Sequence, residues 1–526
     1  MNILFLYGAD LADEAEKPLL NGKNSVLTAI ERAKNFPGVE KTVVLADTAF
    51  NLEIPDGIQL ERRDSWTKRG LLECMSALSA GYDISYFAFA DCPFLDPGIT
   101  ASLAQKHSRY AAEYSYADGW PYGLAPELLS AGTAGILAKI IGDDNSAVTR
   151  DTLFSVIQKD INNFDIEAEI SSVDLRCHRL SFCADSKRNL LLMERFISAA
   201  GNSVPATTDT EWIIAEHPEI LRTLPNYFPV QVYGACPQSC AICPYPALAN
   251  VTERKDFMDS NKFEILLDKI TGFCGDAVIN LSMWGEISMH PEKLKLVEMV
   301  INRPGLALVI ETSGIGWNND ELEYCARLAK DCGKRKNPLN AMSWIVSLDS
   351  IDSNRYAKIR GAGYAEARDC AKKLFSLFGK NCYVQAIRVN GEEDDTEKFY
   401  RYWKENAPYH EDNIIIQKFD DFCGALERRQ ASDISPVIRR PCWHIMRDMP
   451  VLIDGTVPLC REELSVLKGY LNGNSDKHSE TSGLGNVFTG NLEQIWERGN
   501  SFYKRHCEKN YTAACAKCDE YYTYNF

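Results

Sequence analysis

In the sequence of 526 residues we expect no segment that would direct the chain to a membrane or anchor it there. Its N-terminus, MNILFLYGADLADE, has no basic region and reaches Gly8 and Asp10 after a single strand-length apolar run, so we expect no signal peptide. No run of roughly eighteen apolar residues follows, so we expect no transmembrane helix. Low-complexity tracts and repeats of fixed period are also missing. The sequence therefore predicts a cytoplasmic protein with no membrane partner.

The sequence also has fewer basic than acidic residues. Lys and Arg number 57 against 73 Asp and Glu, a net charge of −16, which disfavours a nucleic-acid clamp or an anionic membrane surface as the main partner. The contents of hydrophobic residues (45%) and charged residues (25%) are ordinary for a globular protein. The length predicts three or four domains with their own cores, which excludes a small scaffold held by disulfides.

Cysteine, by contrast, is abundant, with eighteen residues. In a reducing cytoplasm, clustered cysteines hold metal or take part in catalysis more often than they form disulfides. The positions of the cysteines along the chain therefore decide what they do.

Strand and helix patterns predict an α/β protein in three parts. Residues 1–200 alternate strand-like and helix-like segments, which predicts a parallel, Rossmann-like sheet with covering helices. Residues 201–225 are polar at first, contain proline, and are typical of a linker. Residues 226–425 hold six strand-helix alternations, which predict a partial (β/α)6 barrel. Residues 436–526 contain short strands, glycine-rich turns and cysteines, which predict a small irregular domain.

The first cysteine cluster directly follows the first strand of the predicted barrel. Cys236, Cys240 and Cys243, in GACPQSCAICPYP, form a C-x3-C-x2-C run. Three thiolates from one loop can hold three corners of a cubane iron-sulfur cluster and leave the fourth iron open. The carboxyl end of a barrel strand is also where barrel enzymes place their chemistry. The alternatives are a zinc knuckle or three unrelated buried cysteines.

This run resembles the radical S-adenosylmethionine (SAM) superfamily, and the ends of the next strands agree with that resemblance. Trp284-Gly285-Glu286 is similar to the family's Gly-Gly-Glu motif, with tryptophan in place of the first glycine. Ile242 stands where an aromatic residue is usual. Each motif alone also fits a polar strand end that caps a helix. The resemblance implies one [4Fe-4S] cluster, and SAM bound by Ile242, Gly285, Glu286, Thr312, Ser313, Ser347, Asp349 and Arg360.

The second cysteine cluster lies near the C-terminus. The segment PVLIDGTVPLC is typical of a hairpin that turns at Asp454-Gly455, which would return Cys460 towards Cys442. Four thiolates from a hairpin and a C-x2-C loop suit a four-iron cluster or a tetrahedral zinc ion. With LGNVFTGNLEQIWERG, this tail resembles the SPASM/Twitch extension of radical SAM enzymes in a shortened form. That resemblance implies one auxiliary [4Fe-4S] cluster on Cys442, Cys460, Cys515 and Cys518.

The remaining cysteines, Cys423 and Cys507 included, are interpreted as thiols that pack in the core or lie partly buried.

The N-terminal part resembles the nucleotidyltransferase fold of enzymes that make sugar nucleotides and the molybdenum cofactor. Lys17-Pro18-Leu19 matches the family's K-P-L, and Asp91 begins the D-x-P-F match in DCPF, which implies a divalent cation such as Mg²⁺ at Asp91. The loop GADLADE is acidic where the family has a glycine-rich phosphate loop ending in arginine, so it would repel a triphosphate. The alternative is a retained fold without activity, with Asp91 as a helix cap.

The resemblances imply an enzyme that cleaves SAM reductively to a 5′-deoxyadenosyl radical and abstracts hydrogen from a substrate. The N-terminal domain favours a carbohydrate, cyclitol or nucleotide-linked small molecule as substrate, with a peptide or protein substrate of the SPASM type as the alternative. An electron donor such as flavodoxin or ferredoxin is expected. A bifunctional enzyme with active nucleotidyl transfer and a non-catalytic metal-binding scaffold are further hypotheses. No catalytic acid or base is assigned; Glu311, Asp349 and Tyr383 are candidates by their location near strand ends.

Overall fold

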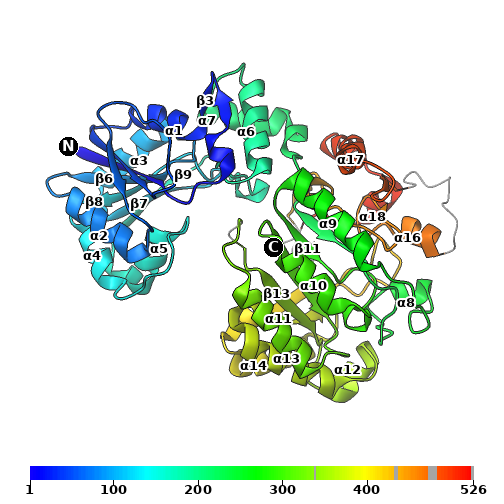
Figure 1. Ribbon diagram of the computed structural model, residues 1–526. Helices are drawn as coiled ribbons and strands as arrows, with labels where there is room; N and C mark the ends of the chain where they lie inside the picture. The colour runs from blue at the N-terminus through cyan, green and yellow to red at the C-terminus, as the bar shows by residue number, and fades with distance from the viewer. Residues whose placement is uncertain (337–338, 432–435, 472–482, 523–526) are drawn as a thin grey trace. The chain divides into compact units, whose positions relative to one another are not determined.

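The computed structural model describes residues 1–336, 339–431, 436–471 and 483–522, and it forms two compact units, residues 1–223 and 224–526 (Figure 1). The segment expected as a linker differs from that expectation. It contains helix α7 (Thr207–Glu216) and a short 3-10 turn, η4 (Pro218–Leu221), both inside the first unit. Ile213 and Ile214 of α7 are buried, and this apolar pair explains why the segment folds onto the unit.

The first unit is built on a mixed seven-stranded sheet in the order β5-β4-β1-β6-β8-β7-β9. The prediction of a fully parallel sheet is wrong at one strand, because β8 runs antiparallel to both β6 and β7. The connection from β7 to β8 is too short for a crossover helix, which a parallel pair would need. The strands are β1 (Asn2–Gly8), β4 (Val39–Ala46), β5 (Gln59–Arg62), β6 (Ile84–Phe89), β7 (Tyr114–Asp118), β8 (Glu127–Ser130) and β9 (Ile166–Ile170).

The first unit also contains six further α-helices, a small hairpin and three short 3-10 helices, η1 (Asp13–Glu16), η2 (Gln158–Asn163) and η3 (Arg176–His178). Their ends follow ordinary capping rules: Asp96, for example, accepts hydrogen bonds from the backbone of Gly98 and Ile99 at the start of α3. The helices are α1 (Ser25–Ala33), α2 (Lys68–Leu78), α3 (Pro97–Arg109), α4 (Thr133–Ile140), α5 (Thr152–Ile157) and α6 (Lys187–Ala199), and the hairpin pairs β2 (Pro18–Leu20) with β3 (Lys23–Asn24).

The second unit contains the half-barrel that the sequence predicts. Its six strands are all parallel and lie in chain order, β10 to β15. The strands are β10 (Tyr227–Pro229), β11 (Ala277–Asn280), β12 (Leu306–Thr312), β13 (Met342–Ser347), β14 (Cys382–Arg388) and β15 (Ile414–Lys418). The helices between them are α8 (Tyr245–Leu248), α9 (Ser260–Cys274), α10 (Lys293–Ile301), α11 (Asn319–Asp331), α12 (Ser353–Ile359), α13 (Tyr364–Phe378) and α14 (Glu393–Asn406).

The cysteine-rich tail shares the core of the half-barrel instead of forming a compact unit of its own. Val451 and Trp496 are buried in the same hydrophobic cluster as Phe228 of β10. The chain turns at Asp454-Gly455 as expected, but the strand after the turn, β16 (Thr456–Val457), pairs with β17 (Gly485–Asn486). Val451, before the turn, pairs with Val230 beside the half-barrel. The helices of the tail are α15 (Trp443–Arg447), α16 (Leu464–Leu471), α17 (Leu492–Cys507) and α18 (Ala513–Lys517).

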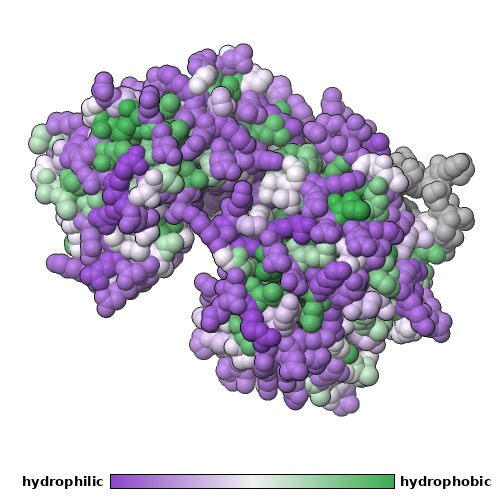
Figure 2. All heavy atoms as spheres, viewed as in Figure 1, coloured by the Kyte–Doolittle hydropathy of each residue, from purple (hydrophilic) through white to green (hydrophobic). Residues whose placement is uncertain are grey.

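The surface on the face shown in Figure 2 is mostly hydrophilic, with hydrophobic residues in scattered groups. Within the described residues, no helix combines the length and the apolar character needed to span a bilayer.

Candidate functional site

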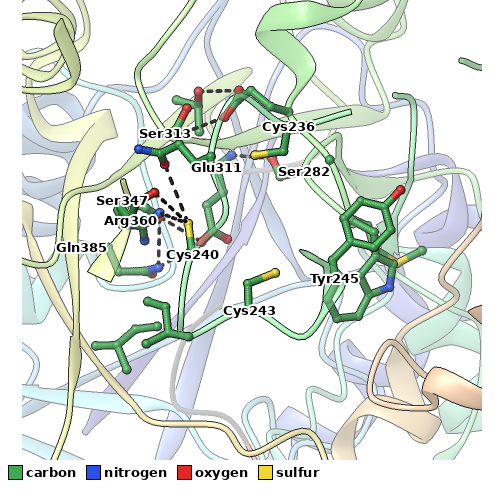
Figure 3. A pocket seen from close by; sticks show the side chains of 18 of the residues that line it. Cys236, Cys240, Cys243, Tyr245, Ser282, Glu311, Ser313, Ser347, Arg360 and Gln385 are labelled. Atoms are coloured by element: carbon green, nitrogen blue, oxygen red, sulfur yellow. Dashed lines mark hydrogen bonds between the residues drawn. The ribbon is translucent and has the colours of Figure 1, made fainter. Parts of the chain in front are cut away.

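The three cysteines of the first cluster lie on the loop between β10 and α8. Their side chains surround one open space, with Arg360 on one side and Tyr245 on the other (Figure 3). Tyr245 fixes the loop by donating from its hydroxyl to the carbonyl of Gly234 at 2.8 Å. Burial raises the pKa of the Cys236 and Cys243 thiols to about 12, so these thiols stay protonated near neutral pH until a metal binds them.

The turn after β11 brings backbone into close contact with this loop. Gly285 is essential there, because a Cβ atom at this position would lie 1.9 Å from the carbonyl oxygen of Tyr233. Trp284 has a φ of 50°, which is the left-handed region that favours glycine. Its ring packs against Tyr245 and Phe422, and these contacts keep a tryptophan in a conformation that glycine adopts more easily.

Glu286 is a buried carboxylate in the wall of the same cavity. It is 4% exposed and accepts hydrogen bonds from the Thr312 hydroxyl at 2.6 Å and the Ser313 backbone at 2.7 Å. Among the described residues it has no basic partner within ion-pair distance. Burial therefore raises its pKa even though the hydrogen bonds favour the ionised form. The site thus holds a buried acid that lacks a cation.

Arg360 provides the opposite charge on the other side of the cavity. It forms an ion pair with Asp349, and its Nη1 lies 3.9 Å from the Cys240 sulfur (Figure 3). Burial opposes the charge of the guanidinium, but Asp349 outweighs it and keeps the pKa of Arg360 raised. Asp349 also accepts from the Ile387 backbone at 2.7 Å, so both of its oxygens are engaged. It therefore lies behind Arg360 and orients it.

A group of polar side chains on β12, β13 and β14 completes the wall. Glu311 accepts hydrogen bonds from Gln385 at 2.9 Å and from the Ser347 hydroxyl at 3.2 Å. Gln385 was not identified from the sequence, although it is a single amide in an apolar strand, CYVQAIRV. Tyr383 is not among the residues that line this cavity, whereas Glu311 is.

Most of the residues that the motif resemblance predicts to bind SAM line this cavity. Asp349 is the exception: it touches the site through Arg360. The other predicted residues line the cavity together with the three cysteines: Ile242, Gly285, Glu286, Thr312, Ser313, Ser347 and Arg360.

A second, smaller cavity collects the cysteines of the tail. Cys442, Cys460, Cys515 and Cys518 all line it, and burial raises the pKa of Cys442 and Cys460. Cys423, interpreted from the sequence as a core thiol, is a fifth cysteine in this cavity, and its proximity contributes to the raised pKa of Cys518. Its position after the last strand of the half-barrel was the signal that could have identified it.

The second cavity also contains an unpartnered polar side chain. His506 is 3% exposed, lines the cavity, and has no hydrogen-bond partner at either ring nitrogen. Burial lowers its pKa to about 4, so the ring is neutral at physiological pH. A buried, neutral imidazole beside five thiols indicates a place built for a polar or metallic group.

At two places in the sequence, one residue lines the first cavity and the adjacent residue lines the second. Phe422 lines the first cavity and Cys423 the second, and Arg461 lines the first while Cys460 lines the second. Lys418, also in the first wall, donates to the carbonyl of Asp519 at 2.7 Å. The wall of the barrel cavity and the wall of the tail cavity are therefore partly formed by the same segments.

The sulfur atoms in the two cysteine cavities are spaced more widely than the ligand atoms of a site for a single metal ion. The described part of the chain has two places where three possible ligand atoms all lie within 4.8 Å of one another. One consists of Asp91, Cys92 and Cys183, and the other of three aspartates at 420, 421 and 519. Neither includes any of the seven cysteines predicted to hold clusters.

Asp91, the predicted cation ligand of the first unit, is held by an arginine. Arg150 donates to both of its oxygens, at 2.7 and 2.5 Å, and also lies 3.5 Å from Asp185. Asp91 does not cap helix α3, because Asp96 has that role. Arg150 thus bridges two carboxylates beside the segment where the resemblance implies a divalent cation.

No protein-family model matches the chain. Three solved structures with similarity to it are BtrN in complex with AdoMet and 2-DOIA, Streptococcus suis SuiB bound to the precursor peptide SuiA, and a cytidylyltransferase from Leptospira borgpetersenii. Their identities are 15%, 11% and 15%, and their TM-scores 0.36, 0.39 and 0.34. The matches cover 56%, 66% and 42% of this chain and 93%, 76% and 96% of those chains. At these scores the similarities assign no function by themselves.

Two proteins of Treponema pallidum (strain Nichols), both described as uncharacterized, are related in sequence. One is 33% identical over 381 residues, which are 71% of this chain and 98% of that protein. The other is 44% identical over 54 residues, 10% of this chain, and the match spans a quarter of that protein's length. The chain belongs to the same protein family as the first of these Treponema pallidum proteins.

Proposed function

We propose that the second unit is a radical SAM enzyme. The observation that carries the proposal is the convergence of three thiols, a buried carboxylate without a cation and a buried arginine on one cavity at the carboxyl edge of a parallel half-barrel. This edge is where such folds bind ligands. Bound to Cys236, Cys240 and Cys243, a [4Fe-4S] cluster would supply the electron that cleaves SAM to methionine and a hydrogen-abstracting 5′-deoxyadenosyl radical.

Glu286 fits the amino group of SAM. A buried carboxylate without a cationic partner is costly, and an incoming ammonium group would provide the missing charge. Thr312, Ser313 and the backbone N–H of Ser288 (3.3 Å) hold the carboxylate in place. Its Oε1 accepts two of these hydrogen bonds and its Oε2 one, so Oε2 keeps a lone pair for the ligand. Gly285 lets the backbone of this turn approach the cluster loop, which positions Glu286 beside the cysteines.

Arg360 fits the carboxylate of SAM. Its Nε is taken by Asp349, its Nη1 lies 3.9 Å from the Cys240 sulfur, and the side chain lines the cavity. Asp349 thereby fixes the guanidinium and balances its charge when no ligand is bound. The walls formed by Ile242 and Trp284 supply apolar surface, and Ser347 and Gln385 supply polar groups, for the adenosine part of SAM.

We further propose that the tail holds an auxiliary [4Fe-4S] cluster on Cys442, Cys460, Cys515 and Cys518. A tetrahedral zinc ion, with Zn–S bonds of about 2.3 Å, would place its sulfurs about 3.8 Å apart. No three ligand atoms of the tail cysteines lie within 4.8 Å of one another in the described residues. A cubane spreads its thiolates over four irons and suits the wider spacing better.

The substrate that this cavity favours is a small polar molecule. Lys418, Asp420 and Arg461 line the cavity wall next to the tail. Lys418 is paired with Glu520 and Arg461 with Glu462, so this wall offers polar groups whose charges are partly balanced within it. A carbohydrate, cyclitol or nucleotide-linked molecule would match these groups, with a peptide as the alternative. The electron would come from a flavodoxin or ferredoxin in the cytoplasm. An auxiliary cluster beside this wall would either accept an electron from the substrate or hold the substrate in position.

Metal analysis of anaerobically reconstituted protein tests the proposal. Two four-iron clusters predict about eight irons per chain. Addition of SAM should shift the electron paramagnetic resonance spectrum of the reduced protein, and Cys236→Ala should remove both that response and about four irons. A chain that binds zinc in the tail and little iron would instead be a metal-binding scaffold.

A further inference from the structure

Three possible metal ligands meet in the first unit, outside the proposed SAM site. The Cys92 sulfur lies 3.4 Å from the Cys183 sulfur and 3.8 Å from Oδ1 of Asp91. Their exposed fractions are 2%, 0% and 3%. Cys92 and Asp91 follow strand β6, whereas Cys183 lies just before helix α6, so the fold brings together segments about 90 residues apart.

The backbone around these three residues is fixed from both sides. The Ala184 N–H donates to the carbonyl of Asp91, and the Phe182 N–H donates to the carbonyl of Tyr122, both at 2.9 Å. Gly123 has a φ of 94°, and a Cβ there would lie 2.8 Å from the Phe182 carbonyl and 3.4 Å from the Cys92 sulfur. The close approach of the two cysteines is therefore built into the backbone.

We propose that Asp91, Cys92 and Cys183 bind a zinc ion. With Zn–S bonds of about 2.3 Å and Zn–O bonds of about 2.0 Å, a tetrahedral ion places two sulfurs about 3.8 Å apart and a sulfur and an oxygen about 3.5 Å apart. The observed separations, 3.4 and 3.8 Å, lie close to these values. The sulfur ligands favour zinc over magnesium, which prefers oxygen ligands only.

Arg150 completes the charge balance of such a site. Two thiolates and a carboxylate carry three negative charges, so one remains after a Zn²⁺ ion binds. Arg150, which donates to both oxygens of Asp91, compensates that charge and orients the carboxylate. Each oxygen of Asp91 keeps a second lone pair for the metal.

The site has access from a cavity. Cys92 and Arg150 line a pocket with Tyr122 and Glu127. Three protein ligands leave one position of a four-coordinate zinc ion for water or for a ligand that enters from this pocket, the arrangement found in zinc sites that act on substrates. This site does not depend on the radical SAM proposal, because none of its residues belongs to the second unit.

Elemental analysis of the full chain, reconstituted anaerobically with iron and zinc, tests the zinc site. Cys92→Ala and Cys183→Ala should each contain about one zinc per chain less than the wild type. Cys74→Ala, which removes a buried thiol from α2 of the same unit, should keep the zinc. Equal zinc contents in all four proteins, or none in any, would overturn the proposal.

The zinc dependence of the melting temperature provides a second readout. Removal of zinc with a chelator should lower the melting temperature of the wild type and of Cys74→Ala, and added zinc should restore it, because a metal that binds the native state stabilises it. Cys183→Ala should not respond. A Cys183→Ala protein that melts at a lower temperature but still responds to zinc, or a Cys92–Cys183 disulfide found by mass spectrometry of anaerobic wild-type protein, would contradict the site.

Discussion

Glu286→Gln tests whether the buried carboxylate binds the amino group of SAM. The change keeps the shape of the side chain and removes its charge. It removes the charge-assisted hydrogen bond to the ligand, which is worth about 1.5–3 kcal/mol. At about 1.4 kcal/mol per factor of ten, the dissociation constant for SAM should rise about 10- to 150-fold. The amide also places an NH2 group against one of the donors, Thr312 or Ser313, which costs further stability.

The assay is calorimetric titration of SAM into anaerobic, iron-loaded protein, with iron content and melting temperature measured on the same samples. Glu298→Gln is the matched control, because Glu298 lies on α10, accepts a hydrogen bond from Tyr324 and does not line the cavity. It should bind SAM as the wild type does. Unchanged SAM affinity in a fully iron-loaded Glu286→Gln protein would refute the assigned role of Glu286.

Three further predictions concern packing, the fifth tail cysteine and pH. Gly285→Ala should destabilise the protein by about 1–3 kcal/mol and weaken SAM binding, because the new methyl meets the Tyr233 carbonyl; chemical denaturation and titration measure both. Cys423→Ala should keep its iron, whereas Cys515→Ala should lose about four irons per chain. Burial raises the pKa of Glu127 to about 7, so the folded state keeps a proton that the unfolded state releases near pH 4.5. Stability should therefore fall by up to about 3 kcal/mol between pH 4.5 and 7, and less in Glu127→Gln; hydrogen exchange of β8 at several pH values measures this.

The chain offers controls for these tests. Gly272→Ala, on helix α9, has no atom within 4 Å of the new Cβ and should stabilise the protein by up to about 1 kcal/mol. An equal loss of stability in Gly272→Ala and Gly285→Ala would contradict the steric argument. A loss of about four irons in Cys423→Ala would show that this thiol is a ligand. If the stability of the wild type and of Glu127→Gln changed with pH in the same way, Glu127 would not be the group that holds the proton in the folded state.

The half-barrel was predictable because its signals are local and repeated. Buried parallel strands read as apolar runs, and polar residues such as Glu286 and Ser347 mark their carboxyl ends. The topology then brings these ends together, so the order of the motifs was enough to place the cavity. Antiparallel β8 was missed because it has only four residues and no helix lies between it and β7, so it looks like any other short apolar run.

Long-range contacts were the part that the sequence did not reveal. The proximity of Cys92 and Cys183 depends on the path of the chain around Gly123, and the position of Arg150 depends on the loop before α5. Cys423 was interpreted as a small core residue on a helix or strand face, and only the fold places it in the cavity of the tail cysteines. The helix α7 in the expected linker was missed for the same reason: its few apolar residues are buried only by contacts with the rest of the unit.

The formation of 5′-deoxyadenosine tests the central claim most directly. Full-length protein, reconstituted anaerobically, would be given SAM and a strong reductant, and the product measured by mass spectrometry. The wild type should form 5′-deoxyadenosine, Cys236→Ala should form none, and Cys325→Ala, which changes a buried thiol on α11, should keep the activity. No 5′-deoxyadenosine from wild-type protein that carries its full iron, or equal amounts from Cys236→Ala, would contradict the assignment of this cavity to radical SAM chemistry.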